Sequence, residues 1–252
     1  MIEEVVDGIR LGVGDCIGME LVDKFDLLYI DPPFGPIGED KYYGECETFE
    51  GYIEYIYERV VRLCEGKEDY NVVIHIDPKA SHYLKVRFDS FFGRDSFCNE
   101  IIWGWSGPSS NKSHLPRKHG VLLWYGKGDY VFNPVYVPYN ESALRVGGKT
   151  SWAGEKKEVS EYIKRGKMIE DWWVDIPPLI RNESEKRGYA TQKPVKLLER
   201  IVGMLSNKGG LVIDPMFGSG TTAIACKNLG RLFFGSDKSV EAMNIAKKAL
   251  LG

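Results

Sequence analysis

The sequence has few cysteines and no motif that would pair them. Five cysteines are scattered along the 252 residues, and none forms a C-x-x-C arrangement: Cys16, Cys46, Cys64, Cys98 and Cys226. The four histidines also lack the spacing of metal ligands. These absences argue against a disulfide framework and against a zinc site, so we expect reduced thiols and no bound metal.

Long apolar runs and an excess of one charge are missing as well. No stretch approaches the ~20 apolar residues of a membrane span, and residues 1–7 lack the basic and apolar regions of a signal peptide. Lysine and arginine number 33 against 36 acidic residues, which gives a net charge of −3. That balance argues against coating of nucleic acid through bulk charge, although a local basic face stays open. We expect a cytoplasmic globular protein without a membrane partner.

Short apolar runs and segments of helical periodicity alternate along most of the chain. The predicted strands are 9–15, 25–30, 71–76, 101–105, 121–125, 211–214 and 232–237. The predicted helices are 52–63, 81–92, 195–205, 221–228 and 240–250. Between 133 and 187 the alternation fades. This order predicts an α/β fold with a doubly wound sheet.

A carboxylate and two prolines follow the predicted strand 25–30, in the run Asp31-Pro32-Pro33-Phe34. Proline fixes its own φ and restricts the residue before it, so Asp31 is held extended. Neither proline has an N–H, which leaves nearby carbonyls free to accept hydrogen bonds. An amino group placed here would meet the Asp31 carboxylate, the Pro32 carbonyl and the Phe34 ring. From these residues alone, a simple strand-ending turn is an equal alternative.

A glycine turn follows the predicted strand 211–214. It reads Asp214-Pro215-Met216-Phe217-Gly218-Ser219-Gly220-Thr221-Thr222 and leads into a predicted helix. Glycines let a ligand approach the backbone, and a helix start offers free N–H groups. Asp237 ends the next strand, where a carboxylate suits ribose hydroxyls. A nicotinamide enzyme is therefore a rival, but the third glycine of G-x-G-x-x-G and the lysine of a P-loop are absent.

Together with Thr191-Gln192-Lys193-Pro194, these two motifs resemble those of the amino-group DNA methyltransferases. The resemblance is to the permuted (beta) group, in which the target-amine motif precedes the cofactor motifs, and it covers nearly the whole chain. It implies a mostly parallel, seven-stranded Rossmann-like sheet with S-adenosylmethionine as the cofactor. The implied catalytic core is 1–132 with 188–252, and the implied target-recognition insert is 133–187. The family usually has phenylalanine where this chain has Met216.

The resemblance also implies roles for single residues. The Thr191–Pro194 segment would bind the methionine carboxylate of the cofactor, although a plain helix start with proline is the alternative. The pair Gly14-Asp15, which Cys16 follows, would lie beside the cofactor's adenine, although from the residues alone a simple turn there is an equal alternative. The full predicted cofactor set is Asp15, Cys16, Asp31, Thr191, Gln192, Lys193, Pro194, Asp214, Pro215, Met216, Phe217, Gly218, Ser219, Gly220, Thr221, Thr222 and Asp237.

Basic residues gather in two places that could contact DNA. The loop 106–119 carries Lys112, Arg117 and Lys118, and the segment 133–187 carries Lys156, Lys157, Lys164, Arg165 and Arg187 among aromatic residues. Such a mixture suits contacts with phosphates and bases. Acidic residues are interspersed, so a solvated charged face is the alternative. The position of the segment before Thr191 favours target recognition by resemblance.

The chemistry implied is methylation of an exocyclic amine on a base that has left the duplex. By resemblance, aspartate at position 31 suggests adenine N6, whereas serine there is typical of cytosine N4. We therefore expect a site-specific, prokaryotic or phage-encoded adenine-N6 methyltransferase acting on double-stranded DNA. The alternatives are a cytosine-N4 enzyme, methylation of RNA or of a protein amide, and a catalytically inactive nucleic-acid-binding subunit. Besides DNA, the suggested partners are a second copy of the chain and a cognate restriction endonuclease.

Overall fold

The computed structural model describes residues 2–6, 8–16, 18–19, 22–33, 46, 48–109, 112–139, 164–179, 184–189 and 191–252. The chain divides into two compact units, 1–132 with 172–252, and 133–171. The predicted insert extended to 187, but residues 172–187 fall in the first unit. The physical reason is strand pairing: β9 (Trp172–Trp173) pairs with β5 (Phe97–Gly104), and Trp103 Nε1 donates to the Ile176 carbonyl at 2.7 Å.

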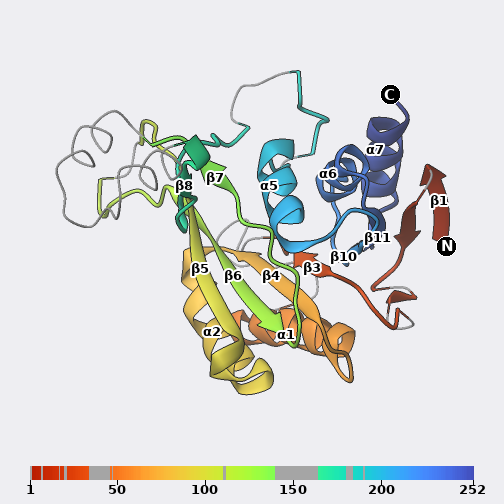
Figure 1. The fold of residues 1–252 in the computed structure, drawn as a ribbon, viewed down its shortest axis with the longest axis horizontal. Helices are drawn as coiled ribbons and strands as arrows, with labels where there is room; N and C mark the ends of the chain where they lie inside the picture. Colours follow the sequence, from red (N-terminus) through yellow and green to blue (C-terminus); the bar gives the residue numbers. More distant parts are fainter. Residues whose placement is uncertain are drawn as a thin grey trace. The chain divides into compact units, whose positions relative to one another are not determined.

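In the described part of the first unit, nine strands form one sheet in the order β1-β2-β11-β10-β3-β4-β6-β5-β9 (Figure 1). Besides β5 and β9 they are β1 (Ile2–Val6), β2 (Ile9–Val13), β3 (Leu27–Ile30), β4 (Tyr70–Ile76), β6 (His119–Lys127), β10 (Leu211–Asp214) and β11 (Leu232–Asp237). Neighbours from β2 to β4 are parallel, whereas β1 and β6 run antiparallel to theirs. The predicted α/β fold and mostly parallel sheet are confirmed, and β1 and β9 extend the seven predicted strands at the two edges.

Two groups of helices cover opposite faces of this sheet. The helices of the first group are α1 (Phe49–Cys64) and α2 (Pro78–Phe92), with a short 3-10 turn, η2 (Arg94–Ser96), after α2. Those of the second group are α5 (Val195–Leu205), α6 (Thr221–Leu229) and α7 (Val240–Leu251). On β4, Val72 and Ile74 pack toward α1 and α2, while Asn71 Nδ2 donates to the Leu205 carbonyl of α5 at 3.1 Å. Every helix within the described ranges falls short of the length or apolar character that a membrane crossing requires.

Capping residues in the sequence set where the helices of the first group begin. The Thr48 side chain accepts a hydrogen bond from the Gly51 N–H at the start of α1. Asp77 does the same for Lys79 at the start of α2, and Pro78 follows at the first helical position, where its missing N–H costs nothing. Because Asp77 directly follows Ile76, the last residue of β4, the change from strand to helix occurs at one residue at the edge of the sheet.

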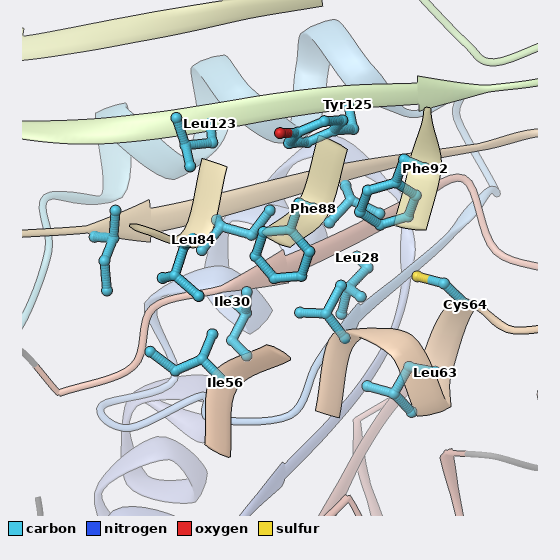
Figure 2. Close-up of a cluster of buried hydrophobic side chains, with 14 of the residues drawn as sticks. Leu28, Ile30, Ile56, Leu63, Cys64, Leu84, Phe88, Phe92, Leu123 and Tyr125 are labelled. Carbon is cyan, nitrogen blue, oxygen red and sulfur yellow. The ribbon is translucent and has the colours of Figure 1, made fainter. Parts of the chain in front are cut away.

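A cluster of buried side chains fills the space between β3, β4, β6 and the helices α1 and α2 (Figure 2). Leu28 and Ile30 from β3 meet Ile56 from α1, Phe88 from α2 and Leu123 from β6. Each fully buried side chain of this kind stabilises the fold by roughly 1.5–3 kcal/mol. All four residues of β3 are buried, as expected for a parallel strand covered on both faces. The strand is therefore a rigid support for Asp31, which follows it.

The carboxyl ends of the parallel strands meet at one edge of the sheet. Asp31 follows β3, Asp214 ends β10 and Asp237 ends β11. Because β6 runs antiparallel to β4, with Val121 opposite Ile76, the loop 105–118 before β6 emerges at this same edge. Ligands of open α/β sheets collect at this edge, so we expect the functional site to lie here.

The second unit has its own small sheet. β7 (Tyr136–Val137) pairs antiparallel with β8 (Lys167–Met168). Arg165 places its guanidinium over the Tyr136 ring, 4.9 Å from the centroid. Two of the predicted DNA contacts in this unit, Lys156 and Lys157, lie outside the described residues.

Candidate active site at the carboxyl edge of the sheet

The segment after β3 is held by hydrogen bonds from two other parts of the chain, and His75 of β4 lies nearby. Tyr52 of α1 donates its hydroxyl to the Pro33 carbonyl at 2.9 Å, which anchors the two prolines. Lys193 Nζ lies 2.5 Å from Asp31 Oδ2. His75 Nδ1, from β4, lies 4.0 Å from Asp31 Oδ1. Phe34, the fourth residue of the predicted motif, lies outside the described residues.

Burial sets the protonation of the groups around Asp31. It raises the pKa of Asp31, and the Lys193 ammonium acts in the opposite direction. Burial, reinforced by Lys193, keeps the pKa of His75 well below its usual range, so this imidazole is neutral. Burial also raises the pKa of Tyr29 well above its usual range, so its hydroxyl keeps its proton; it lies 3.0 Å from His75 Nδ1. The site thus contains an ion pair, Asp31 with Lys193, next to two neutral polar side chains.

The glycine turn between β10 and α6 has a backbone that only glycine adopts readily. Gly218 has φ of 51° and Gly220 has φ of 75°. A Cβ on Gly220 would lie 2.6 Å from Ala246 Cβ of α7, closer than carbon atoms can approach. The turn is therefore a fixed, tightly packed element with the N-terminus of α6 behind it.

Asp237 connects this turn to the start of α7. Its Oδ2 accepts a hydrogen bond from the Gly218 N–H at 3.0 Å, and its Oδ1 accepts one from the Ser239 N–H at 2.8 Å. Burial raises the pKa of Asp237, and the two backbone N–H groups act against that rise. Each oxygen keeps a further lone pair, which a ligand hydroxyl could use.

Asp214 lies under the turn. Its Oδ1 accepts the Met216 N–H at 2.9 Å and its Oδ2 accepts the Thr222 hydroxyl at 2.7 Å. Burial raises the pKa of Asp214 to about 7, against these two hydrogen bonds. The carboxyl is thus both a structural brace and a group that titrates near neutrality.

The segment before α5 folds back on itself and delivers Lys193 to the site. The Gln192 side chain accepts from the Arg187 N–H at 2.9 Å and donates to the Glu185 carbonyl at 2.7 Å. Glu185 Oε1 in turn accepts the Val195 N–H at 2.6 Å, which satisfies a free donor at the start of α5. Pro194 is the N-cap of that helix.

Asp15 lies at the outer side of the site. Its carboxylate pairs with Arg59 of α1 and, at 3.5 Å, with Lys238. Although burial opposes the change, the hydrogen bond and charge of Arg59 lower the pKa of Asp15. Cys16 is buried and burial raises its pKa to about 12, so its thiol stays protonated.

One cleft brings most of the predicted cofactor set together. Its lining includes Asp15, Asp31, Thr191, Lys193, Asp214, Pro215, Met216, Phe217, Gly218, Ser219, Thr221, Thr222 and Asp237, together with Pro33 from the predicted target-amine motif, the run Asp31-Pro32-Pro33-Phe34. Predicted residues outside the lining are Cys16, Pro32, Gln192, Pro194 and Gly220. Residues of the lining that the sequence did not point to are Tyr29, Tyr55, Tyr189, Leu198 and Lys238. Tyr29 stands two residues before Asp31 and Lys238 directly follows Asp237, so proximity to a motif could have found both; the other three carry no local signal.

The predicted DNA contacts that the structure describes lie at several places. Lys112 and Arg117 are exposed on the loop 105–118, and Lys118 Nζ donates to the Pro108 carbonyl at 3.2 Å. Lys164 is exposed in the second unit. Arg187 is half-buried beside Gln192, and burial lowers its pKa.

Comparison with known proteins gives a family and relatives. The DNA methylase family model matches residues 25–248. The type II methyltransferase M.BglII of Bacillus subtilis is 29% identical over 254 residues, covering 95% of this chain and 68% of the relative. M.BamHI of Bacillus amyloliquefaciens is 30% identical over 238 residues, covering 90% of this chain and 53% of the relative. The chain spans about half to two thirds of the length of such curated relatives.

Solved structures share the fold. The M1.HpyAVI–SAM complex has a TM-score of 0.63 at 23% identity, and the match covers 96% of this chain and 98% of that chain. The PvuII DNA methyltransferase, described as cytosine-N4-specific, also has a TM-score of 0.63, at 15% identity. The match covers 94% of this chain and 84% of that chain. At these identities the likeness concerns the arrangement of the backbone.

Proposed function

The chain belongs to the DNA methylase family, and we propose that it transfers a methyl group from S-adenosylmethionine to the N6 amine of a flipped-out adenine in double-stranded DNA. The observation that carries the proposal is the shared cleft. In it, the carboxylate that follows β3 lies beside the glycine turn after β10 and the carboxylate that ends β11. A group that holds an amine and a surface that suits a nucleoside are thus open to the same space.

The residues of the cleft fit S-adenosylmethionine. Asp237 offers carboxylate lone pairs to ribose hydroxyls, and Met216 and Phe217 offer apolar contact. Lys193 and Lys238 are the cations of the lining, suited to an amino-acid carboxylate, while Asp31 and Asp214 suit its ammonium group. When bound, the cofactor supplies an electrophilic methyl group. Its identity has independent support, because the M1.HpyAVI structure of the same fold is a SAM complex.

The chain's own contribution is to make a poor nucleophile reactive. The lone pair of the adenine amine is delocalised into the ring, so the nitrogen attacks weakly. Asp31 and the Pro32 carbonyl accept its two N–H groups and favour a pyramidal nitrogen with a localised lone pair, which is complementary to the transition state. Positive charge that develops on the nitrogen is stabilised by the Asp31 carboxylate. Because burial raises the pKa of Asp31, this carboxylate is also a better acceptor for the proton that the nitrogen must lose.

Cytosine N4 is the second candidate for the target amine. A structure of the same fold and equal TM-score is described as cytosine-N4-specific. Aspartate at position 31, where serine is typical of the cytosine enzymes by resemblance, favours adenine. Analysis of nucleosides from methylated DNA by mass spectrometry separates the two products.

The wider setting of the enzyme follows from its relatives. The bacterial type II methyltransferases among them lead us to propose a cytoplasmic enzyme that acts on DNA, with a cognate restriction endonuclease as a partner. Homodimer formation belongs to the same proposal, and light scattering on the purified chain tests it. The second unit, with the segment up to residue 187, is proposed to contribute to target recognition.

Single-turnover methylation with tritiated cofactor tests the role of Asp31. Asp31→Ala removes the strongest acceptor for the amine, and Asp31→Asn keeps the shape but presents an N–H₂. We expect both variants to lose ~10²-fold or more in rate, since a positioned polar group is typically worth that much. DNA binding should stay near normal, because phosphate contacts elsewhere dominate affinity.

Asp23→Asn is the matched control, because Asp23 is exposed and lies before the amino end of β3. It makes the same chemical change without touching the cleft, and its rate should equal that of the wild type. Rates near wild type in both Asp31 variants would show that the residues after β3 form only a turn.

A further inference from the structure

The ion pair between Lys193 and Asp31 is an unusual feature of the cleft. The two residues are 162 positions apart in the chain, yet Lys193 Nζ and Asp31 Oδ2 are 2.5 Å apart. Both side chains are largely buried, with relative exposures of 9% and 16%. A buried pair of this kind costs desolvation energy, so its presence in a site calls for a functional explanation.

The surroundings of Asp31 leave Lys193 as its counter-ion. The titratable groups facing Asp31 are Lys193 from the segment before α5, His75 from β4, Tyr29 from β3 and Asp214 from β10. Burial keeps His75 neutral and Tyr29 protonated, and Asp214 opposes a second negative charge. Asp31 Oδ1 is enclosed and receives no hydrogen bond from the part of the chain that the structure describes. Among those residues, Lys193 is thus the one cation that stabilises ionised Asp31.

We propose that Lys193 is a positioning residue for Asp31: its ammonium group keeps the buried carboxylate ionised and fixes the direction in which it accepts a hydrogen bond from the target amine. This inference rests on the function proposed above. It differs from a contact with the methionine carboxylate of the cofactor, which is the role that resemblance implied for Lys193 and that its place in the cleft also allows. The two roles make different predictions for Lys193→Gln.

The pH dependence of methylation activity distinguishes the two roles considered for Lys193. Ionised Asp31 accepts the amine N–H groups, so activity is lost as the pH falls through the pKa of this carboxyl. Without Lys193, burial acts unopposed and that pKa rises further, so the loss begins at higher pH. In Lys193→Gln, the acid limb of kcat/KM should move up by at least about one pH unit, and alkaline pH should restore part of the activity. Loss of a contact to the cofactor alone would weaken cofactor binding and leave the acid limb in place.

Lys238→Gln is the matched control. Lys238 also lines the cleft and carries the same charge, but its carboxylate partner is Asp15. The control removes one positive charge from the cleft without touching Asp31, so its acid limb should stay at the wild-type pH. Calorimetry of S-adenosylmethionine binding to both variants completes the comparison. An unmoved acid limb in Lys193→Gln, with cofactor affinity lowered by the same factor as kcat/KM, overturns the proposal.

A measurement on the ligand-free protein keeps this inference separate from the proposed function. Infrared spectroscopy follows protonation of the Asp31 carboxyl against pH, with Asp31→Asn subtracted to identify its band. Protonation should occur at higher pH in Lys193→Gln than in wild type, and Lys193→Arg should restore the wild-type midpoint. Equal midpoints in wild type and Lys193→Gln overturn the inference whatever the activity. A protein with the expected shift but no methylation of any DNA would instead overturn the proposed function.

A double variant covers the case in which Lys193→Gln does not fold. In Asp31→Asn/Lys193→Gln the lone buried carboxylate is gone, so folding should return and the double variant should melt above the value that the two single changes predict by addition. Absence of such recovery would mean that the two side chains are not energetically coupled, and the inference fails.

Discussion

At the scale of a single residue, the Asp237 carboxylate stabilises the fold and is also proposed to bind the cofactor. These two effects can be measured separately. Its oxygens hold the Gly218 and Ser239 N–H groups, and the same carboxylate is the proposed partner of the ribose hydroxyls. Asp237→Ala should therefore weaken cofactor binding by about 1.5–3 kcal/mol and also lower the melting temperature. Calorimetry gives the first quantity and thermal unfolding the second.

Ser239→Ala separates these effects. The Ser239 side chain accepts the Ala242 N–H at 3.1 Å and caps α7, but it is not part of the cleft lining. Removing this cap should cost about 1 kcal/mol of stability and leave cofactor affinity unchanged. If folded Asp237→Ala binds the cofactor as tightly as wild type, its carboxylate is only a structural brace.

At the scale of elements, we propose that the loop 105–118 contacts DNA, because it precedes β6 at the edge of the sheet where Asp31 lies. It leaves the sheet at the carboxyl edge, and Lys112 and Arg117 are exposed on it. Neutralising both as Lys112→Gln/Arg117→Gln should lower DNA affinity and flatten the salt dependence. Two lost phosphate contacts reduce the slope of log K against log salt by about 1.8. Fluorescence anisotropy at several salt concentrations measures it.

The control for this loop lies at the opposite edge of the sheet. Lys127 ends β6 opposite Tyr70, the first residue of β4, and Lys208 precedes β10. Both are exposed, and Lys127→Gln/Lys208→Gln changes the net charge by the same amount. If the two double variants lose affinity equally, the effect of the loop is one of overall charge and not of contact.

The elements that sequence reasoning predicted well are those with a strong periodic signal. Strands 211–214 and 232–237 appear with the predicted bounds, and the helices differ from prediction by a few residues. β9 has two residues, too few for any periodicity, and β1 is an antiparallel edge strand whose pairing is a tertiary matter. In the candidate site, strand ends and the glycine turn were visible in the sequence. The pairing of Lys193 with Asp31 was not, because local pattern carries no information on a contact 162 residues apart.

At the scale of the whole molecule, Asp214 links the stability of the fold to pH. Its pKa is about 7 in the folded chain against an ordinary value of 3.8. Because the folded pKa is raised, its contribution to stability is complete below about pH 4 and is lost as the pH rises through 7. Asp214→Asn cannot ionise, and Thr222 can turn its hydroxyl to accept from the new N–H₂.

Relative to wild type, Asp214→Asn should therefore gain stability between pH 4 and 8, by on the order of 2–4 kcal/mol. Thermal unfolding of both proteins across this range measures the difference in stability. Asp31 and Asp237 also have raised pKa values, but both proteins contain them, so their effects on stability largely cancel in the difference. Exposed Asp23→Asn should show no such trend. A constant gap in melting temperature between Asp214→Asn and wild type would mean that Asp214 does not titrate in this way.

The order of strands across the sheet has a consequence for how the protein is made. β10 and β11 lie between β2 and β3 in the sheet. β2 and β3 are made early in translation, but they cannot become parts of one sheet until the ribosome has translated residues 211–237. Until then the growing polypeptide carries two unpaired strand edges, which are templates for aggregation and targets for chaperones. Sheets closed by such distant segments also fold slowly. The interval between translation of Asp31 and its meeting with Lys193 is therefore a period in which the cell must protect an unfinished sheet.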